Sequence, residues 1–310
     1  MPVHANILDL GSMTAFEVDA LDRARTTIFL VVSPIEEHGP HLPLATDVIE
    51  AEGVARRLAA RLATERPADR FLFYPTIPLG ADSFHFAGSA SVRPGVIAAL
   101  VEDVCTSLAE GGFTRFIVSS HHGAPSHNLA FERAAIRVRR RTRGRARLLA
   151  LSGRTIVDLY FGGGLEAHFA HMKDGESAKD ALRLDCHAGA FETSELLALR
   201  PDLVREGWKD LPPVLVPLEK LTRESGRREA AGKGYFGAPG ISSVERGEAY
   251  LDMLVERAMP DVRAFLDGKD VPGLALRWRL ALSALSTIAD WKDRLASWTG
   301  RRKKHARPSV

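Results

Sequence analysis

Cysteine and long apolar runs are scarce in this chain, and each absence excludes a class of protein. Its 310 residues contain two cysteines, Cys105 and Cys186, without a spacing pattern, which argues against a disulfide scaffold and favours a reducing compartment. No stretch approaches the roughly 18 consecutive apolar residues of a membrane span. The N-terminal segment lacks the layout of a signal peptide. We therefore expect a cytoplasmic protein without an integral membrane span.

The chain also lacks a large excess of positive or negative charge. The net charge of +3 gives no argument for or against a polyanionic partner. Residues 137–147 hold seven arginines, but no aromatic residue is interleaved with them, so base stacking is not indicated. We expect a solvated helix end or a subunit contact there, and no nucleic-acid partner.

Short β-branched or aromatic runs alternate with segments of helical periodicity. We expect strands over residues 26–32, 71–77, 114–119 and 147–152, and helices over 47–63, 95–109, 128–141, 191–199 and from about 243 to 266. This alternation is typical of an α/β fold, a three-layer sandwich with a mainly parallel central sheet flanked by helices. In such sheets functional groups gather at the carboxyl ends of the strands.

Two segments depart from this alternation. Residues 154–184 have weak periodicity and a Gly162-Gly163-Gly164 run, which predicts a long irregular insertion, either a lid or a plain surface loop. We divide the chain into a main domain over 1–267 and a C-terminal extension over 268–310, an amphipathic helix with a basic tail. Its apolar stripe predicts packing on its own domain or on a neighbouring subunit, with a membrane-surface anchor as the alternative.

The segment from Glu36 to Asp47 carries the strongest chemical signal. It places Glu36, His38 and Asp47 within a dozen residues, just after the apolar run 28–32. Burying such groups unpaired at the end of a strand costs several kcal/mol. A loop of carboxylate and imidazole groups after a strand is how a scaffold presents a metal ion to solvent. We interpret this segment as half of a metal site.

Three further polar clusters cover residues 83–89, 120–128 and 185–194. Nine of the eleven histidines fall in the four clusters or in the insertion: His38, His41, His85, His121, His122, His127, His168, His171 and His187. Any one of them taken alone is more simply a hydrogen-bonded structural residue. Four ligand-rich loops at one edge of a parallel sheet favour a shared metal site.

These segments resemble the motifs of the creatininase (creatinine amidohydrolase) family. Residues 36–47 are similar to its Glu-x-His-Gly-x-His-Leu-Pro-x-x-Thr-Asp segment, and residues 187–194 match its His-Ala-Gly-x-x-Glu-Thr-Ser segment without exception. Looser matches are residues 120–124, to an Asn-x-His-Gly-Gly type of loop, and residues 86–89, to a Phe-x-Gly-Thr type of turn. The resemblance runs from about residue 16 to residue 266.

The resemblance implies an α/β fold, a homohexamer, and two divalent metal ions that hydrolyse a carbon–nitrogen bond of a small-molecule substrate. Glu36 and His122 would bind one metal and His38 the other, with Asp47 bridging. Ligands of this kind without thiolates suit zinc, manganese or iron, and a water between two such cations has its pKa lowered toward about 7. His187 then fits the general acid/base that passes a proton to the departing nitrogen, with a structural role as the alternative.

This chain differs from the family pattern at two positions near the predicted site. Creatininase has a metal-binding Glu two residues after the histidine that matches His122, whereas this chain has Ala124. Glu192 is our candidate to complete the second site. Its alternative role is structural: a carboxylate in the first turn of a helix stabilises the helix by about 0.3–1 kcal/mol through the helix dipole. Ser120 replaces the usual Asn, which alters a hydrogen bond near the site.

Tryptophan placement bears on the substrate, because creatininase closes over its substrate with tryptophans. All four tryptophans here follow the motifs: Trp208, Trp278, Trp291 and Trp298. We therefore expect a different cyclic amide, or a formamide, rather than creatinine, with His41, His85 and Ser89 as candidate substrate-binding residues. Two alternatives stay open: the same metal site acting on a carbon–carbon or ester-like bond of a cyclic ketone, and a catalytically idle, metal-loaded assembly or binding subunit.

Overall fold

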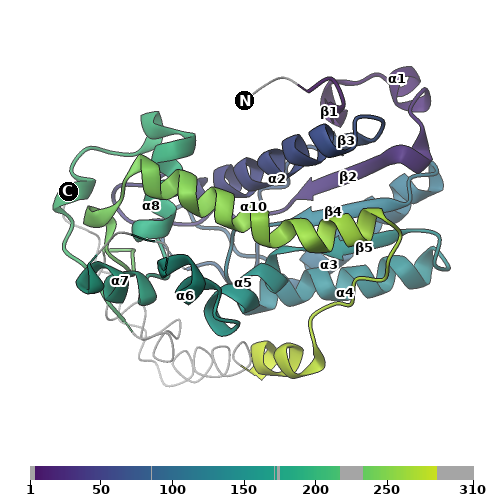
Figure 1. Ribbon diagram of the computed structural model, residues 1–310. Coiled ribbons are helices and arrows are strands. Elements are labelled where there is room, and N and C mark those ends of the chain that lie inside the picture. The colour runs from purple at the N-terminus through teal and green to yellow at the C-terminus, as the bar shows by residue number, and fades with distance from the viewer. Residues whose placement is uncertain (1–3, 85, 171, 173–174, 217–232, 285–310) are drawn as a thin grey trace.

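The computed structural model describes residues 4–84, 86–170, 172, 175–216 and 233–284, and its strands form one parallel sheet within them (Figure 1). The strand order is β1-β3-β2-β4-β5. The strands are β1 (Ile7–Asp9), β2 (Thr26–Val31), β3 (Arg70–Phe73), β4 (Arg115–Ser119) and β5 (Arg147–Ala150). β2 is buried along its whole length, and Ile28 lies opposite Leu72 of β3 and Phe116 of β4. Burial on both faces explains why this strand reads as a continuous apolar run.

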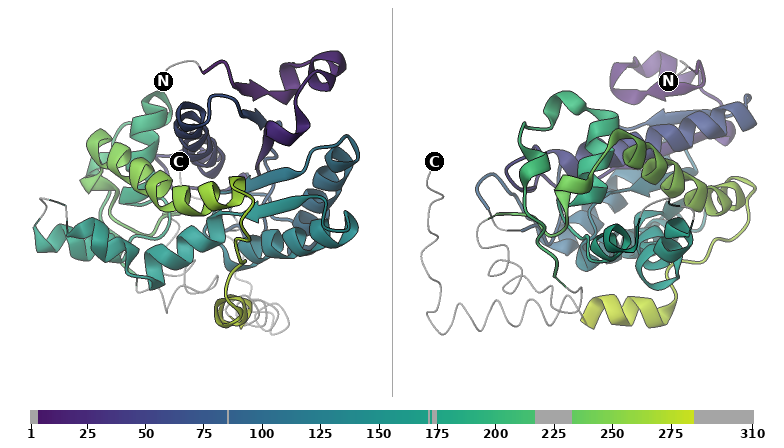
Figure 2. Two further views of the ribbon diagram at one scale, coloured as in Figure 1. Left: turned by 45° about the vertical axis from the view of Figure 1, so that its right-hand side comes forward. Right: turned by 60° about the vertical axis from the view of Figure 1, so that its left-hand side comes forward.

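Helices cover both faces of the sheet, as Figures 1 and 2 show. One face carries α2 (Thr46–Glu65) and α10 (Val244–Leu266), and the other carries α3 (Pro94–Glu110) and α4 (Pro125–Arg141). Successive residues of β2 point to opposite faces, so that Phe29 and Val31 pack with α2 and α10 while Ile28 and Leu30 pack with α3 and α4. The three-layer α/β sandwich predicted from the sequence is confirmed.

The chain diverges beyond the carboxyl ends of β2 and β4, which are neighbours in the sheet. From β2 it runs to α2 on one face, and from β4 it runs to α4 on the other. In open parallel sheets this divergence leaves a crevice in which ligands bind. The loops after these two strands are the ones that contain Glu36, His38 and His122.

The insertion is helical, so the expected irregular segment over residues 154–184 was wrong. Its described residues form α5 (Ser152–Phe161), α6 (Gly164–Phe169) and α7 (Glu176–Arg183), and α8 (Ala190–Leu199) follows. Leu165, Phe169 and Leu182 pack with Tyr250 of α10 in a small apolar cluster. The helices are too short for a clear period, and Gly163 interrupts them with a positive φ of 81°.

The N-terminal segment adds two elements that the sequence pattern did not predict, β1 and α1 (Ala15–Asp19). Thr14 and Glu17 form a capping box at the start of α1. Single 3-10 turns cover Leu10–Ser12, Arg23–Arg25, Pro201–Leu203, Trp208–Asp210 and Pro239–Ile241. These elements are short, and so weak period-based signals are expected for them.

The described part of the C-terminal extension packs on its own domain. Leu274 and Leu282 pack with Leu129 of α4 and Val157 of α5, and a helix covers residues 276–284. Leu276 and Leu280 remain 67% and 62% exposed. The basic tail and Trp291 lie outside the described residues, so the division at residue 267 remains a prediction. None of the described helices combines the length and the hydropathy needed to cross a bilayer.

We predict that Gly247→Ala destabilises the protein by about 1–3 kcal/mol, the usual cost of overpacking. A Cβ at Gly247 of α10 would lie 1.9 Å from the backbone oxygen of Ser194 in α8. Urea unfolding should show this loss even though alanine is the better helix former. Gly95→Ala is the matched control, because a Cβ at Gly95 of α3 meets nothing within 4 Å. Equal stabilities for the two variants would contradict the close packing of α8 on α10.

Candidate metal centre

Carboxylate and imidazole side chains from three parts of the chain meet at the carboxyl ends of β2 and β4. Glu36 and His38 lie in the loop between β2 and α2, and Asp47 lies in the first turn of α2. His122 follows β4, and Glu192 lies in the first turn of α8. Side-chain atoms of these residues belong to two adjacent groups, and Asp47 of the first lies close to His38 of the second.

The first group consists of Glu36, Asp47 and His122, whose ligand atoms lie within 4.8 Å of one another. The Nδ1 atom of His122 lies 3.0 Å from Oε2 of Glu36 and 3.5 Å from Oδ2 of Asp47. All three residues are buried. Two carboxylate oxygens and an imidazole nitrogen at this spacing are a ligand set for zinc, manganese or iron.

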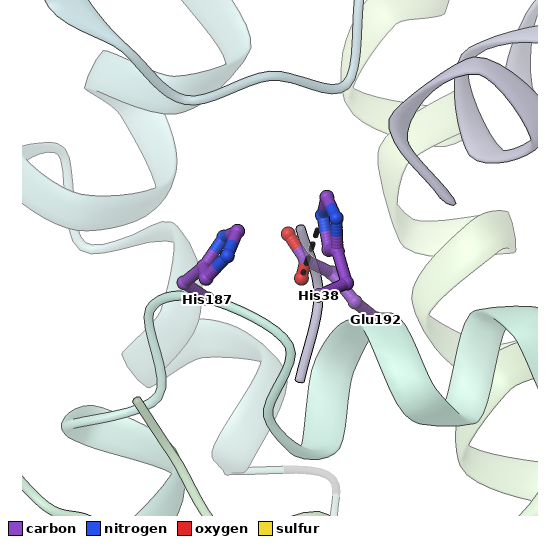
Figure 3. A group of neighbouring side chains, drawn as sticks. All are labelled: His38, His187 and Glu192. Atoms are coloured by element: carbon purple, nitrogen blue, oxygen red, sulfur yellow. Dashed lines mark ion pairs between the residues drawn. The ribbon is translucent and has the colours of Figure 1, made fainter. Parts of the chain in front are cut away.

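The second group contains His38, His187 and Glu192 (Figure 3). The Nε2 atom of His38 is 3.6 Å from Oε2 of Glu192 and 3.9 Å from Oδ1 of Asp47. Asp47 therefore turns one oxygen toward His122 and the other toward His38. A carboxylate that bridges two cations needs this arrangement.

Three of the candidate ligand atoms, one each on Glu36, His38 and Asp47, are left without hydrogen bonds, whereas other polar atoms of the site are held. Oε2 of Glu36, Nε2 of His38 and Oδ2 of Asp47 are buried and form no hydrogen bond. Nδ1 of His38 instead donates to the Glu36 carbonyl at 3.0 Å, and Nε2 of His122 donates to the Ala81 carbonyl at 3.0 Å. Such bonds fix the rings and leave the opposite nitrogen for a metal. The residues present thus fit a pair of divalent cations.

Attraction between carboxylates and imidazoles shifts the pKa values of Asp47 and His122 in the first group. Burial on its own raises the pKa of Asp47, but the charges of His38 and His122 bring that pKa well below its usual value. Burial on its own lowers the pKa of His122, but Glu36 and Asp47 raise it well above its usual value. Without a cation, protons on imidazole compensate the buried carboxylates; a metal must displace such a proton.

His187 is fixed from several sides. Its Nε2 donates to the Glu37 carbonyl at 2.8 Å, and its backbone forms an antiparallel bridge with Phe236. Burial lowers the pKa of the ring, but its interaction with the Glu37 carboxylate, whose Oε1 lies 3.5 Å from Nε2, and the charges of Glu36 and Glu192 outweigh burial and raise the pKa to about 10. The ring thus holds its proton at neutral pH before any metal binds.

The turn between His187 and Glu192 depends on a buried aspartate. Asp185 accepts a hydrogen bond from the backbone N–H of Phe191 at 2.6 Å, and a Cβ at Gly189 would lie 1.5 Å from its Oδ1. Ala188 has a positive φ of 48°, and its N–H donates to the carboxylate of Glu192. Only glycine fits at position 189, which explains the His-Ala-Gly sequence at the start of α8.

Ala124 offers no ligand and lies at the N-cap of α4. Ser120 takes part in holding the loop, since its hydroxyl contacts that of Ser33 at 2.7 Å and accepts from the His122 N–H at 3.2 Å. Asn128 donates to the carbonyls of His122 and Ala124 at 2.9 and 3.0 Å. The polar residues around His122 therefore order its loop.

The three candidate substrate-binding residues are placed differently. His41 is buried, and its Nε2 lies 2.8 Å from the hydroxyl of Thr193; its pKa is lowered to about 4, mainly by burial. The hydroxyl of Ser89 accepts from the Glu37 N–H at 2.9 Å. His85 lies outside the described residues. Neither His41 nor Ser89 lines the cavity next to the candidate metal centre. His41 contacts the start of α8, and Ser89 contacts the loop that contains Glu37.

A cavity of about 120 Å³ lies beside the metal centre. Its polar wall includes His121, His187, Glu192 and Glu195, and its apolar wall comes from helices α5, α6 and α10, with Ile156, Leu159, Leu165 and Met253 among the lining residues. No tryptophan is among the described residues that line it. The cavity thus offers a place for a small molecule with an apolar part next to the ligand groups.

Sequence reasoning missed one group of residues close to the centre. Glu50, His121 and Glu195 form a third cluster, with ligand atoms within 4.8 Å of one another. Each lies one residue or one helical turn from a predicted site residue: His121 precedes His122, and Glu50 and Glu195 follow Asp47 and Glu192 by three. Residues three apart share one face of a helix, and this spacing was the signal that could have found them.

We predict that metal binding to the metal-free protein at pH 7 releases at least one proton per chain. His122 has a raised pKa, so it is protonated before binding and neutral afterwards. The apparent affinity should therefore fall as the pH falls, because protons compete with the cation. Calorimetric titration with Zn²⁺ in two buffers of different ionisation enthalpy measures the number released. Identical heats in both buffers would contradict the displacement of a proton by the metal.

Comparison with known proteins relates most of this chain to one family. The creatininase family model, described as creatinine amidohydrolase, matches residues 11–261. Mycofactocin precursor peptide peptidase of Mycobacterium tuberculosis (strain CDC 1551 / Oshkosh) is 27% identical over 270 residues, which cover 84% of this chain and 93% of the relative. Creatinine amidohydrolase of Pseudomonas putida is 26% identical over 263 residues, which cover 82% and 95%.

Solved structures of similar fold include two metal forms of creatininase. A structure described as creatininase Mn aligns with a TM-score of 0.63 at 22% identity, covering 83% of this chain and 98% of the other. A mutant creatininase of the Zn-Zn type aligns with the same TM-score at 21% identity and the same coverage. At this level of identity the likeness shows the shared fold.

Proposed function

Because the chain belongs to the creatininase family, we propose that it is a metal-dependent amidohydrolase that cleaves a carbon–nitrogen bond in a small polar metabolite. Glu36, His38, Asp47, His122 and Glu192 would hold two divalent cations of the zinc, manganese or iron type. The observation that carries this proposal is the set of buried ligand atoms without hydrogen bonds on Glu36, His38 and Asp47. Buried polar atoms are rarely left unpaired without a reason.

The cations would supply a water of lowered pKa and would polarise the carbonyl of the amide. The protein's own part is proton transfer and positioning. Since Nε2 of His187 donates to the Glu37 carbonyl, Nδ1 is the ring atom left to exchange a proton with the departing nitrogen. An amine is a poor leaving group unless it is protonated, and a positioned imidazole contributes about 10²–10⁴-fold to such a step.

The cavity indicates the kind of amide. Its apolar wall, which includes Ile156, Leu159 and Met253, favours a substrate with a small apolar part beside the scissile bond. A cyclic amide or a formamide remains our first candidate. Creatinine is disfavoured because no tryptophan is found among the described lining residues.

A second candidate is a peptide bond of a short peptide. It is favoured by the similarity to relatives named mycofactocin precursor peptide peptidase, which extends over 84% of this chain. Both reactions break an amide bond, so the same residues would serve both. Incubation with a panel of cyclic amides, formamides and short peptides, followed by mass spectrometry, separates them by whether formate, an opened ring or a free amino acid appears.

We predict that Asp47→Ala loses most of the bound metal and all measurable turnover, because Asp47 belongs to the first ligand group and its Oδ1 lies 3.9 Å from His38 of the second. Metal content by mass spectrometry should fall well below that of the wild type. Glu52→Gln is the matched control: Glu52 lies in the same helix, half-buried and hydrogen-bonded to Thr76. A wild-type protein that binds no metal after loading would refute the proposal.

We predict the opposite pattern for His187→Asn: unchanged metal content with kcat reduced about 10²–10⁴-fold. The residue is assigned to proton transfer, so the variant should also lose the limb of the pH–rate profile that reports the imidazole. Metal analysis and the profile, measured on whichever amide the panel identifies, check both parts. Turnover that stays at the wild-type level would remove His187 from the mechanism.

A further inference from the structure

The third cluster repeats the metal-binding pattern one step further along the same elements. α2 presents Asp47 and, three residues later, Glu50; α8 presents Glu192 and, three residues later, Glu195. Residues at this spacing lie on one face of a helix. The loop after β4 supplies His121 directly before His122. The three elements that converge on the first centre therefore place a second set of two carboxylates and one imidazole beside it.

The geometry of this set is that of a ligand group. The Nε2 atom of His121 lies 3.5 Å from Oε2 of Glu50 and 3.2 Å from Oε2 of Glu195. Glu50 is fully buried and Glu195 is 2% exposed. Neither carboxylate oxygen of Glu50 forms a hydrogen bond, and neither does Oε2 of Glu195. A buried carboxylate left in this way is costly unless a cation or several donors meet it.

A nearby arginine does not fill this role. Arg57 lies two helical turns after Glu50 in α2 and contributes a positive charge near Glu195. Its guanidinium, however, pairs with Glu248 at 2.7 Å and with Asp252 at 3.5 Å, both on α10. The cluster also adjoins the centre already described, since Glu50 lies within 4.8 Å of ligand atoms of Asp47 and Glu192.

We propose that Glu50, His121 and Glu195 bind a third divalent cation, next to the two held by the main centre. Two carboxylates and one imidazole are a set used by zinc, and three protein ligands leave coordination positions for another molecule. His121 and Glu195 line the cavity, so those positions belong on the substrate side. The class of ligand that fits is an oxygen anion, such as a carboxylate carried by the substrate.

The alternative is that an imidazolium at His121 pairs with both carboxylates and no metal is present. The two cases differ in the number and position of bound ions. Wild-type protein loaded with Mn²⁺ should contain three ions per chain, and anomalous diffraction at the manganese edge should place one of them between Glu50, His121 and Glu195. Glu195→Gln and His121→Asn should each lower the content from three ions to two, while Glu52→Gln keeps three.

The outcomes separate this inference from the proposed function. Two peaks at the main centre and none between Glu50, His121 and Glu195 at saturating Mn²⁺ overturn the third site alone. A third ion located elsewhere on the protein overturns it too. No peak at either position overturns both proposals. The wild-type diffraction decides the matter even if a variant fails to fold.

Discussion

Negative charge buried at one edge of the sheet is the constraint on which the rest of this structure depends. Glu36, Asp47 and Glu50 are each at most 1% exposed, and Glu192 and Glu195 lie against them. Ions in a protein interior lose hydration worth several kcal/mol each, and only close positive charge restores it. In the metal-free protein His122, whose pKa is raised by Glu36 and Asp47, provides part of that charge. Divalent cations at the proposed centre would provide more of it and would couple metal binding to folding stability.

The scaffold makes this accumulation of charge possible by fixing where each carboxylate can go. α2 and α8 bring acidic side chains from two directions, and α8 is held by its contact with α10 at Gly247. The start of α8 is set by Asp185, whose hydrogen bond to Phe191 leaves no room for a side chain at Gly189. Apolar packing beneath the loops, rather than attraction among the polar groups, keeps them in place.

The sequence predicted the layers of the fold and the segments that make the site, because both depend on local patterns. The buried run of β2 and the period of α2 are visible in one window of residues. The strand order is not, because β3 pairs with both β1 and β2 across long stretches of chain. The helices of residues 152–183 were missed because each is short and is stabilised by contacts with Tyr250 and its neighbours, so tertiary packing overrides weak propensity.

The site shows the same division between local and distant information. Motif matching names Glu36, His38, Asp47, His122 and His187 because they stand at fixed spacings, and the structure places Glu192 3.6 Å from His38. It passes over Glu50, His121 and Glu195, whose roles depend on how α2 and α8 are rotated toward one another. Motif matching also makes His41 a candidate substrate-binding residue, and this stays a prediction. The structure shows its ring beside Tyr235, with Nε2 2.8 Å from the hydroxyl of Thr193.

The candidate metal ligands and the apolar wall of the cavity come largely from different parts of the chain. The ligand groups come from the loops after β2 and β4 and from α8, whereas the apolar wall of the cavity comes largely from α5, α6 and α10. α5 and α6 belong to the insertion, which is tied to the core through Tyr250 and a hydrogen bond from Arg257 to the Gly164 carbonyl. Changes in these helices would alter the shape of the cavity while leaving the ligand atoms where they are. If the proposed function holds, one arrangement of buried carboxylates and imidazoles would serve amides of different shape, because the wall that would recognise the amide is built from other residues.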